Sequence, residues 1–426
     1  MLLLFTQQVS PRISYVFKHI CTRVLGVEVT FTSSIDTFIG HQGPKASYGA
    51  ISLGNELFFQ SQGILLEQGV ESQEITVRPW EETKGFFAVS DQSALPFDIF
   101  AASFYLLSRY EEYLPHVKDA LGRYPSKESL AYKNQFLQTP IVDVWALKLK
   151  AVFITTFPDM AFEKKESENH LFIQAEEPYR YKAKGFSRTL FSYSVDLFGG
   201  RFRELFNRTR VISGMRRDHY DCFKYLITAS KNANYKLSFF FLLGEAREYL
   251  NGVTTYKNKF RQVIKYVADY TEVGLIISAK AQKDVAMLKN EKQQLEDIIL
   301  QDVRRAYNAD QVVDLPHGYR ELVEMEIGQD FTMCYANKPG FRAGTCTPFL
   351  FYDLDFEIKT PLIIAPVAGI SSSFDNYEQE KIKNIILHLK HEVKQVDGHF
   401  ILGLSNTCFG NAKDGKFWRS ILTETL

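Results

Sequence analysis

The sequence predicts an α/β protein of two parts, a small α/β domain over residues 1–160 followed by a distorted (β/α) barrel over residues 168–426. The chain opens with strand, helix and strand, which is the βαβ start of a layered fold. The polar stretch Glu163–His170 is the best candidate for a linker. Beyond it, apolar strand-like runs alternate with helix-like segments at least six times, as in a closed or nearly closed barrel.

The elements of the first part follow from local patterns. Leu2–Phe5 and Val27–Phe31 are short apolar runs of strand character, and Ile13–Val24 between them has helical spacing. The clearest helix is expected to start after Asp98, a good N-cap residue, and to continue to Leu114. Its apolar residues recur at helical spacing, so we expect them in the core.

The second part alternates regularly. The expected strands are Leu171–Ala175, Leu237–Leu243, Val273–Ile277, Val303–Tyr307, PLIIAP at 361–366 and HFILGL at 399–404. The expected helices begin near Tyr220, cover Phe260–Tyr270 and Asp284–Leu300, follow Pro316 and end at Val396. Because helices separate consecutive strands, we expect a parallel sheet with its pocket at the carboxyl ends of the strands.

Composition excludes several functional classes. With 45% hydrophobic residues, the chain can bury large cores. Lys and Arg (50) balance Asp and Glu (50), so we expect no nucleic-acid partner and no overall attraction to an anionic membrane. The five cysteines are scattered and never spaced as CxxC, which favours reduced thiols over disulfides or a zinc cluster.

Localisation is inferred from apolar runs. A membrane-spanning helix needs roughly 20 apolar residues, and no run approaches that length. We therefore expect no transmembrane segment. The first residues, MLLLFTQQVSPR, lack the basic start and small-residue cleavage site of a signal peptide, so they are interpreted as a strand. A cytoplasmic protein is the prediction.

The most informative stretch is FIQAEEPYRYKAKGF, residues Phe172–Phe186. It is an apolar strand that ends in acidic residues and opens into a loop. In a barrel enzyme, this is where a metal-binding carboxylate is displayed, because strand ends hold side chains rigidly toward the pocket. Here Gln174 and Glu176 occupy the strand end.

Several runs of sequence point to a known family. They are DIFAASFYLLSRYEEYL at 98–114, GRYPSKESLAYKN at 122–134, KAKGFSRT at 182–189 and YANKPGFRAGTCTPFLFYDL at Tyr335–Leu354. Together they resemble a bacterial polysaccharide deacetylase-like family, in which an uncharacterised α/β domain precedes a carbohydrate-esterase barrel. The resemblance covers nearly the whole chain and implies a barrel of the polysaccharide deacetylase type.

The resemblance also implies a catalytic pattern from which this chain departs. Active members are expected to carry an Asp as general base and a second Asp as metal ligand, at the positions of Gln174 and Glu176. An amide cannot accept a proton from a metal-bound water at neutral pH, so Gln174 removes the base. Glu176 alone would bind a cation weakly.

The remaining expected groups are replaced as well. The metal-binding histidine expected after the third barrel strand corresponds to Ile276, the histidine expected near the fourth to Ala309, and the acid-providing histidine near the chain end to Ser405. Zinc, which the resemblance implies for active relatives, needs about three nitrogen or oxygen ligands from the protein. The sequence therefore predicts no zinc and no other cofactor.

Other residues are weaker candidates for a site. His317, preceded by Asp314, could pair with Glu176 in a relocated site, but a lone loop histidine is more often structural. Arg342 in PGFRAG is kept as a binding candidate, although its glycines favour a tight loop over a phosphate cradle. Trp418 in KFWRS is the tryptophan expected to be exposed, where it could stack on a sugar ring.

One local patch is strongly basic. It contains Glu204 and six arginines: Arg201, Arg203, Arg208, Arg210, Arg216 and Arg217. Arginine forks grip carboxylates and phosphates, so an acidic glycan, a lipid headgroup or an acidic protein are possible partners. A solvated amphipathic insertion is the simpler interpretation.

Three functions remain open. The leading hypothesis is a catalytically inactive polysaccharide deacetylase-like protein that serves as a binding or assembly module, in surface-glycan metabolism. The second is a hydrolase of an N-acyl or related carbon-nitrogen bond, with Glu176 or Glu177 and His317 in a non-standard site, since paired carboxylates can supply acid and base without metal. The third is a structural partner protein.

Overall fold

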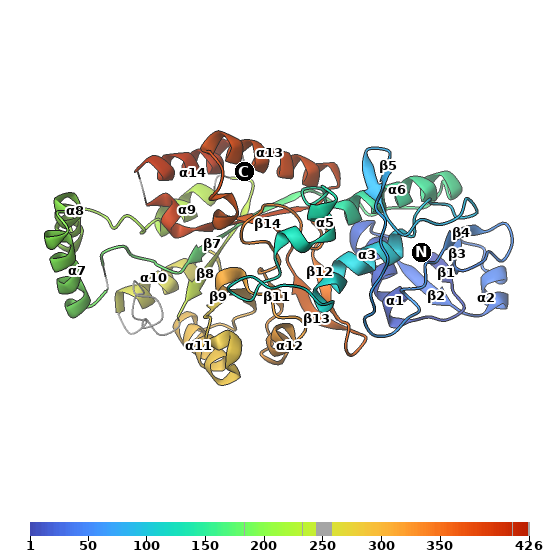
Figure 1. The fold of residues 1–426 in the computed structure, drawn as a ribbon, viewed down its shortest axis with the longest axis horizontal. Helices are drawn as coiled ribbons and strands as arrows, with labels where there is room; N and C mark the ends of the chain where they lie inside the picture. Colours follow the sequence, from blue (N-terminus) through green and yellow to red (C-terminus); the bar gives the residue numbers. More distant parts are fainter. Residues whose placement is uncertain (183, 232, 244–257, 411, 425–426) are drawn as a thin grey trace.

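The computed structural model describes residues 1–182, 184–231, 233–243, 258–410 and 412–424 (Figure 1). Its described strands form a four-stranded parallel sheet, a nine-stranded mixed sheet and a two-stranded ribbon. The four-stranded sheet lies at the right end of Figure 1, and helices α7 and α8 form the left end. The predicted α/β class with two parts is confirmed.

The first sheet has the order β2-β1-β3-β4. Its strands are β1 (Leu2–Phe5), β2 (Val29–Thr32), β3 (Lys45–Gly49) and β4 (Leu57–Gln60), and β5 (Arg78–Trp80) pairs with β6 (Thr83–Gly85). The helices are α1 (Pro11–Phe17, continued by a π-helix to Val24), α2 (Ile35–Gly40), α3 (Ile99–Leu107), α4 (Tyr110–Tyr113), α5 (Leu130–Lys133) and α6 (Ile141–Thr156). The predicted βαβ opening is confirmed.

The helix expected after Asp98 differs from the prediction. Asp98 is its N-cap, and the carboxylate accepts the amide hydrogens of Phe100 and Ala101 at 3.1 and 2.9 Å. The helix does not continue unbroken to Leu114, because Arg109 has a left-handed φ of 54° that breaks it into α3 and α4.

The nine-stranded sheet has the order β12-β13-β11-β10-β9-β8-β7-β15-β14. Its strands are β7 (Glu168–Ala175), β8 (Lys236–Leu242), β9 (Glu272–Ile277), β10 (Arg305–Asn308), β11 (Gln329–Asp330), β12 (Phe349–Asp353), β13 (Ile358–Ile364), β14 (Val367–Ile370) and β15 (His399–Ser405). The helices are α7 (Phe186–Phe198), α8 (Phe202–Ile212), α9 (Phe223–Ser230), α10 (Asn258–Ala268), α11 (Val285–Ile299), α12 (His317–Glu324), α13 (Gln379–Gln395) and α14 (Ala412–Glu424).

The sheet is curled into a half-barrel, and among the described strands β14 pairs with β15 alone. Strands β13 and β14 are near opposite edges of the strand order, yet only Ala365 and Pro366 separate them in the chain. This link draws the two edges toward each other. The expectation of a purely parallel sheet is wrong at β12, which pairs antiparallel to β13 as a hairpin.

The lumen of this barrel is filled with apolar side chains. One buried cluster contains Phe172, Phe240, Leu242, Ile276, Tyr307, Ala309, Phe331, Cys334, Ala365, Val367, Ile370 and Ile401. Gly274 and Gly403 make room for it, because a Cβ at either position would lie 2.4 Å from the ring of Phe240 or Phe172. The lumen is therefore a packed core.

Buried polar contacts join the two parts of the molecule. The Asp143 carboxylate on α6 accepts the hydroxyl hydrogens of Thr345 and Thr347 at 2.7 and 2.6 Å. Arg342 binds Glu112 of α4. Such satisfied buried groups fix the two parts in one arrangement.

Among the described residues, no helix is both long and apolar enough to cross a bilayer. The five cysteines are all free thiols, and four of them are buried.

Candidate functional site

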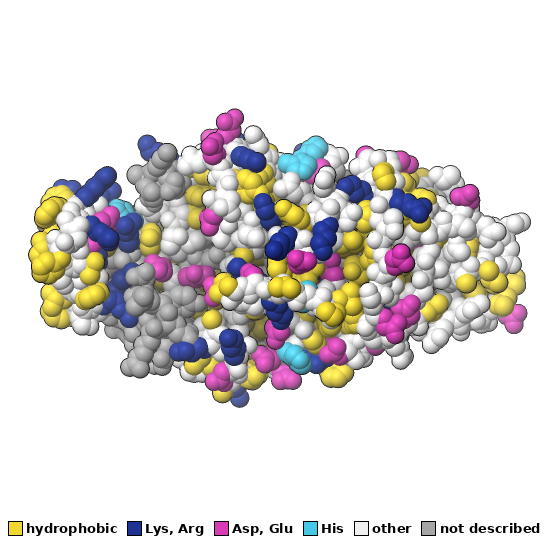
Figure 2. Space-filling model, in the orientation of Figure 1, with side chains coloured by type: hydrophobic (Ala, Val, Ile, Leu, Met, Phe, Trp, Pro, Cys, Tyr) yellow, Lys and Arg dark blue, Asp and Glu magenta, His cyan; other side chains and the backbone are white. Residues whose placement is uncertain are grey.

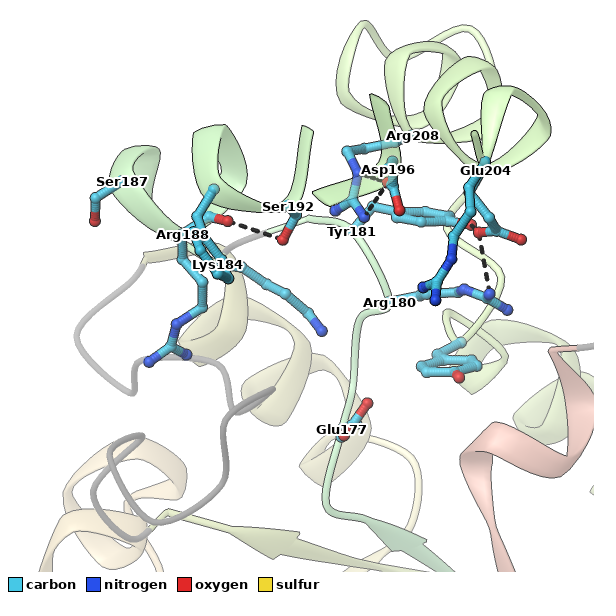
Figure 3. A pocket seen from close by; sticks show the side chains of 13 residues that line it. Glu177, Arg180, Tyr181, Lys184, Ser187, Arg188, Ser192, Asp196, Glu204 and Arg208 are labelled. Atoms are coloured by element: carbon cyan, nitrogen blue, oxygen red, sulfur yellow. Dashed lines mark hydrogen bonds and ion pairs between the residues drawn. The ribbon is translucent and has the colours of Figure 1, made fainter. Parts of the chain in front are cut away.

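A large pocket lies above the carboxyl end of β7 (Figure 3). Its volume is about 970 Å³, and it opens between the loop after β7 and the hairpin of α7 and α8. It is lined by Glu177, Arg180, Tyr181, Lys184, Ser187, Arg188, Phe191, Ser192, Asp196, Arg201, Glu204, Arg208 and Tyr220. This is the end of a barrel at which ligands are usually bound.

Two side chains hold the loop after β7 in place. The Asp218 carboxylate accepts the amide hydrogens of Arg180, Tyr181 and Lys182 at 2.7, 2.8 and 3.0 Å. Asn406, just after β15, donates to the carbonyl oxygens of Glu177 and Tyr220 at 2.9 and 3.2 Å. Because these anchors come from other segments, the floor of the pocket is preorganised.

The wall of the pocket is built from ion pairs. Arg208 of α8 binds Asp196 of α7 at 2.7 Å, and its guanidinium also lies over the ring of Tyr181. Glu204 accepts hydrogen bonds from the Tyr181 hydroxyl at 2.6 Å and from Arg180 at 3.1 Å. Figure 3 shows these groups converging under the two helices.

The pocket is more cationic than anionic. Five basic residues line it (Arg180, Lys184, Arg188, Arg201 and Arg208), against three acidic ones (Glu177, Asp196 and Glu204). Burial lowers the pKa of Lys184, against the opposing effect of Glu177 and Asp218. An anion in the pocket would relieve part of this excess of positive charge.

The barrel mouth beside the pocket holds a carboxyl group that titrates near neutrality. Burial raises the pKa of Glu176 to about 7, and the charges of Asp310 and Glu177 act in the same direction. Asp310 was missed by the sequence reasoning. It follows the short strand β10 in a loop whose pattern gives no sign that it turns toward β7.

The backbone is unusual at the same place. Asp310 and Gln311 are consecutive non-glycine residues with left-handed φ angles of 59° and 56°. Gln311 donates to the Tyr307 hydroxyl at 2.7 Å, which links this turn to the lumen. Backbone strain of this kind gathers at functional sites.

The predicted positions of the base and the metal ligands are occupied by residues that do not fit zinc. Gln174 is only 4% exposed, and Ile276 and Ala309 are buried in the apolar lumen. Ser405 is held in a hydrogen bond with Thr407 at 2.7 Å. Within the described ranges, no three His, Cys, Asp or Glu side chains gather as a metal-binding group.

Three further sequence candidates lie elsewhere. His317 is exposed at the start of α12, and the charges that act on Glu176 come from Asp310 and Glu177 instead. Arg342 is buried in its ion pair with Glu112. The exposed position predicted for Trp418 is wrong: its side chain is 7% exposed and packs against Phe374 and Phe417.

The fold exposes five of the six arginines of the predicted basic patch and buries the sixth. Arg201, Arg203, Arg210, Arg216 and Arg217 are exposed. Arg208, the sixth member of the predicted patch, is buried in its pair with Asp196 and cannot contribute to a surface.

Comparisons with known proteins gave limited matches. A family model described as a family of unknown function (DUF7033) matches residues 2–158, which is less than half of the chain. A search of curated proteins gave no match.

Similar solved structures match the chain only loosely. They include a polysaccharide deacetylase candidate from Mycobacterium smegmatis (11% identity, TM-score 0.39, covering 62% of this chain and 84% of that one). A CE4 family pseudoenzyme from Bacillus anthracis is 8% identical with a TM-score of 0.31, over 61% of this chain and 60% of that one. Puue allantoinase is 8% identical with a TM-score of 0.36, over 61% and 84%. Superpositions this loose assign neither an activity nor a fold family.

Proposed function

We propose that this chain is a non-catalytic, polysaccharide deacetylase-like protein that binds an anionic glycan in the pocket above β7. One observation carries the proposal: the side chains at the expected base and ligand positions, Gln174, Ile276 and Ala309, are buried and lack the required chemistry. The barrel would then supply a rigid support, and the pocket would supply the recognition.

The pocket has the chemistry of an acidic sugar site. Guanidinium and ammonium groups such as Arg201 and Lys184 pair with uronate carboxylates or sugar phosphates. The rings of Tyr181 and Tyr220 also line the pocket and could face a pyranose. The volume of about 970 Å³ accommodates an oligosaccharide of several units.

Calorimetric titration tests the binding. Oligogalacturonate should bind the intact protein, whereas neutral chitooligosaccharide should bind much more weakly. The double variant Lys184→Ala with Arg201→Ala should lose about 100-fold or more in affinity, since each lost charged contact is worth about 1.5–3 kcal/mol. Lys289→Ala, an exposed lysine on α11, is the matched control. Equal binding of acidic and neutral sugars would refute the proposal.

A second function is favoured by the raised pKa of Glu176 to about 7. Together with Asp310, this carboxyl could act as a general acid and base for hydrolysis of an N-acyl bond. Acetate release from acetylated chitooligosaccharide, measured with and without added zinc, separates the two functions. Release that disappears in Glu176→Gln would establish the hydrolase and remove the first proposal.

A further inference from the structure

The hairpin of α7 and α8 buries charged side chains and exposes apolar ones. The buried residue of α7 is the aspartate Asp196, and the buried residues of α8 are Arg208 and Val211. The two helices meet through the Asp196–Arg208 ion pair and a hydrogen bond of 3.0 Å between the Tyr193 and Thr209 hydroxyls. A surface helix normally places its apolar stripe inward and its charges outward.

The apolar side chains of the hairpin point to the outside instead. Phe186 and Phe198 are 85% and 89% exposed, and Phe202 and Phe206 are 67% and 57% exposed. Leu190 and Met215 extend this surface. Figure 2 shows hydrophobic side chains gathered over this end of the molecule, interleaved with basic ones. A cluster of this kind marks a surface that is covered in function, because the burial of exposed phenylalanine rings is favourable.

The net charge of the same segment indicates the kind of partner that would cover its exposed phenylalanines. Residues 184–217 contain eight Lys and Arg against two Asp and Glu, while the whole chain is balanced. Both acidic residues are already paired, Asp196 with Arg208 and Glu204 with Arg180. Among the described residues, Arg201 and Arg203 form no ion pair with a carboxylate. The surface is therefore apolar and cationic together, which complements an anionic lipid bilayer.

The geometry suits a helix pair that lies in the bilayer interface. Helices of 13 and 11 residues are about 20 and 17 Å long, too short to cross the hydrocarbon core. Phe198 and Phe202 flank the turn at Gly199 and Gly200, and Arg210 lies over the ring of Phe206 at 4.6 Å. Aromatic side chains bracketed by arginines are typical of such interfacial elements.

We propose that the α7–α8 hairpin docks the protein on an anionic membrane surface, with its phenylalanines in the acyl boundary and its arginines on lipid phosphates. This goes beyond the glycan-binding proposal and does not depend on it. The pocket above β7 would then lie next to the bilayer.

Vesicle co-sedimentation of the full chain tests the docking. The protein should sediment with vesicles of phosphatidylglycerol and phosphatidylcholine, and not with phosphatidylcholine alone. Phe198→Ser with Phe202→Ser should lower the partition coefficient by about tenfold or more, because two buried rings are removed from the interface. Arg203→Glu with Arg210→Glu should have a similar effect, and added salt should weaken binding of the unchanged protein.

Matched variants elsewhere on the surface serve as controls. Ile39→Ser with Ile51→Ser changes two exposed apolar residues, and Lys289→Glu with Lys394→Glu changes two exposed lysines. Both should bind vesicles as the unchanged protein does. No sedimentation with anionic vesicles, equal binding by the hairpin variants, or a dimer in ultracentrifugation that the phenylalanine variant abolishes without any vesicle binding would each overturn the proposal.

Discussion

Glu112 and Arg342 form a double ion pair that joins the two parts of the molecule: Arg342 donates from Nη2 and Nε to the Glu112 carboxylate at 2.7 and 2.9 Å. Arg109 donates to the same carboxylate at 2.8 Å and also contacts the backbone oxygen of Arg342. Both side chains of the pair are at most 4% exposed. The Glu112 carboxylate thus bridges two buried cations, and Arg109 has a second partner in Glu111 at 2.7 Å.

Removal of that carboxylate should be costly. We expect Glu112→Gln to lower the free energy of unfolding by about 3–5 kcal/mol, because Arg342 would stay buried without its counter-ion. Urea unfolding followed by circular dichroism measures the change. The exposed pair Lys383–Glu424 is the control, and Lys383→Met should cost no more than about 1 kcal/mol. Equal effects of the two substitutions would contradict the argument.

The same pair predicts an acid dependence. Burial alone would raise the pKa of Glu112, but the charges of Arg342 and Arg109 outweigh it and lower the pKa to about 2. A lowered pKa contributes stability that is complete above the unfolded value of about 4.3 and is lost as the pH falls toward the folded value. The stability difference between the unchanged protein and Glu112→Gln should therefore shrink from about pH 6 to about pH 3, as equilibrium unfolding at each pH can measure.

Glu176 should show the opposite dependence. Its pKa is raised to about 7, so the folded state binds the proton more tightly, and ionisation of Glu176 costs stability as the pH rises from about 4.5 toward 7. Glu176→Gln should remove this cost and raise the stability at about pH 8 by ~1–3 kcal/mol, with little change at about pH 5. Asp310→Asn should have part of the same effect, because it removes a charge that raises the Glu176 pKa. A gain that does not depend on pH would count against this account.

The packed lumen predicts a large cost for cavity formation. Phe240→Ala should lower the stability by about 3–5 kcal/mol, since Phe240 is fully buried at the centre of the lumen cluster. Phe186→Ala on α7 is the matched control: that ring is 85% exposed, and its removal should change the stability by less than about 0.5 kcal/mol. Thermal unfolding of both variants provides the comparison. A small effect at Phe240 would mean that the lumen is not the packed core described above.

The sequence allowed the longer apolar strands of the second part and several helices to be predicted, because local periodicity determines them, whereas strands such as β3, β4 and β12 were not predicted. The apolar runs at Leu171–Ala175 and Val273–Ile277 became β7 and β9. Exposure was harder to predict. Trp418 lies in a short charged run, yet it is buried because it packs against Phe374, which is far away in the sequence. The basic patch was recognised, but nothing local indicated that Arg208 would be buried by Asp196. The approach of Asp310 to Glu176 likewise depends on the curl of the sheet.

The loop after β7 gives a last prediction about the candidate site. The Asp218 carboxylate is the shared acceptor for three consecutive backbone amides, Arg180 to Lys182, and such charged hydrogen bonds are worth about 1.5–3 kcal/mol each. Asp218→Ala should therefore release the floor of the pocket. Hydrogen exchange at these amides should become about tenfold faster or more, whereas exchange in β8 and β9 should stay the same, because the lumen does not depend on this anchor.

Asp119→Ala is the control for this change. Asp119 accepts the amide hydrogens of Leu121 and Arg123 at 2.9 and 3.0 Å in a loop of the first part, so its loss should affect exchange there and not at Arg180 to Lys182. If the pocket binds an acidic glycan, Asp218→Ala should also weaken that binding while Asp119→Ala should not, because only the first disturbs the backbone that positions Arg180 and Lys184. Unchanged exchange at Arg180 to Lys182 in Asp218→Ala would show that the loop is held by other contacts and that the pocket does not rely on this carboxylate.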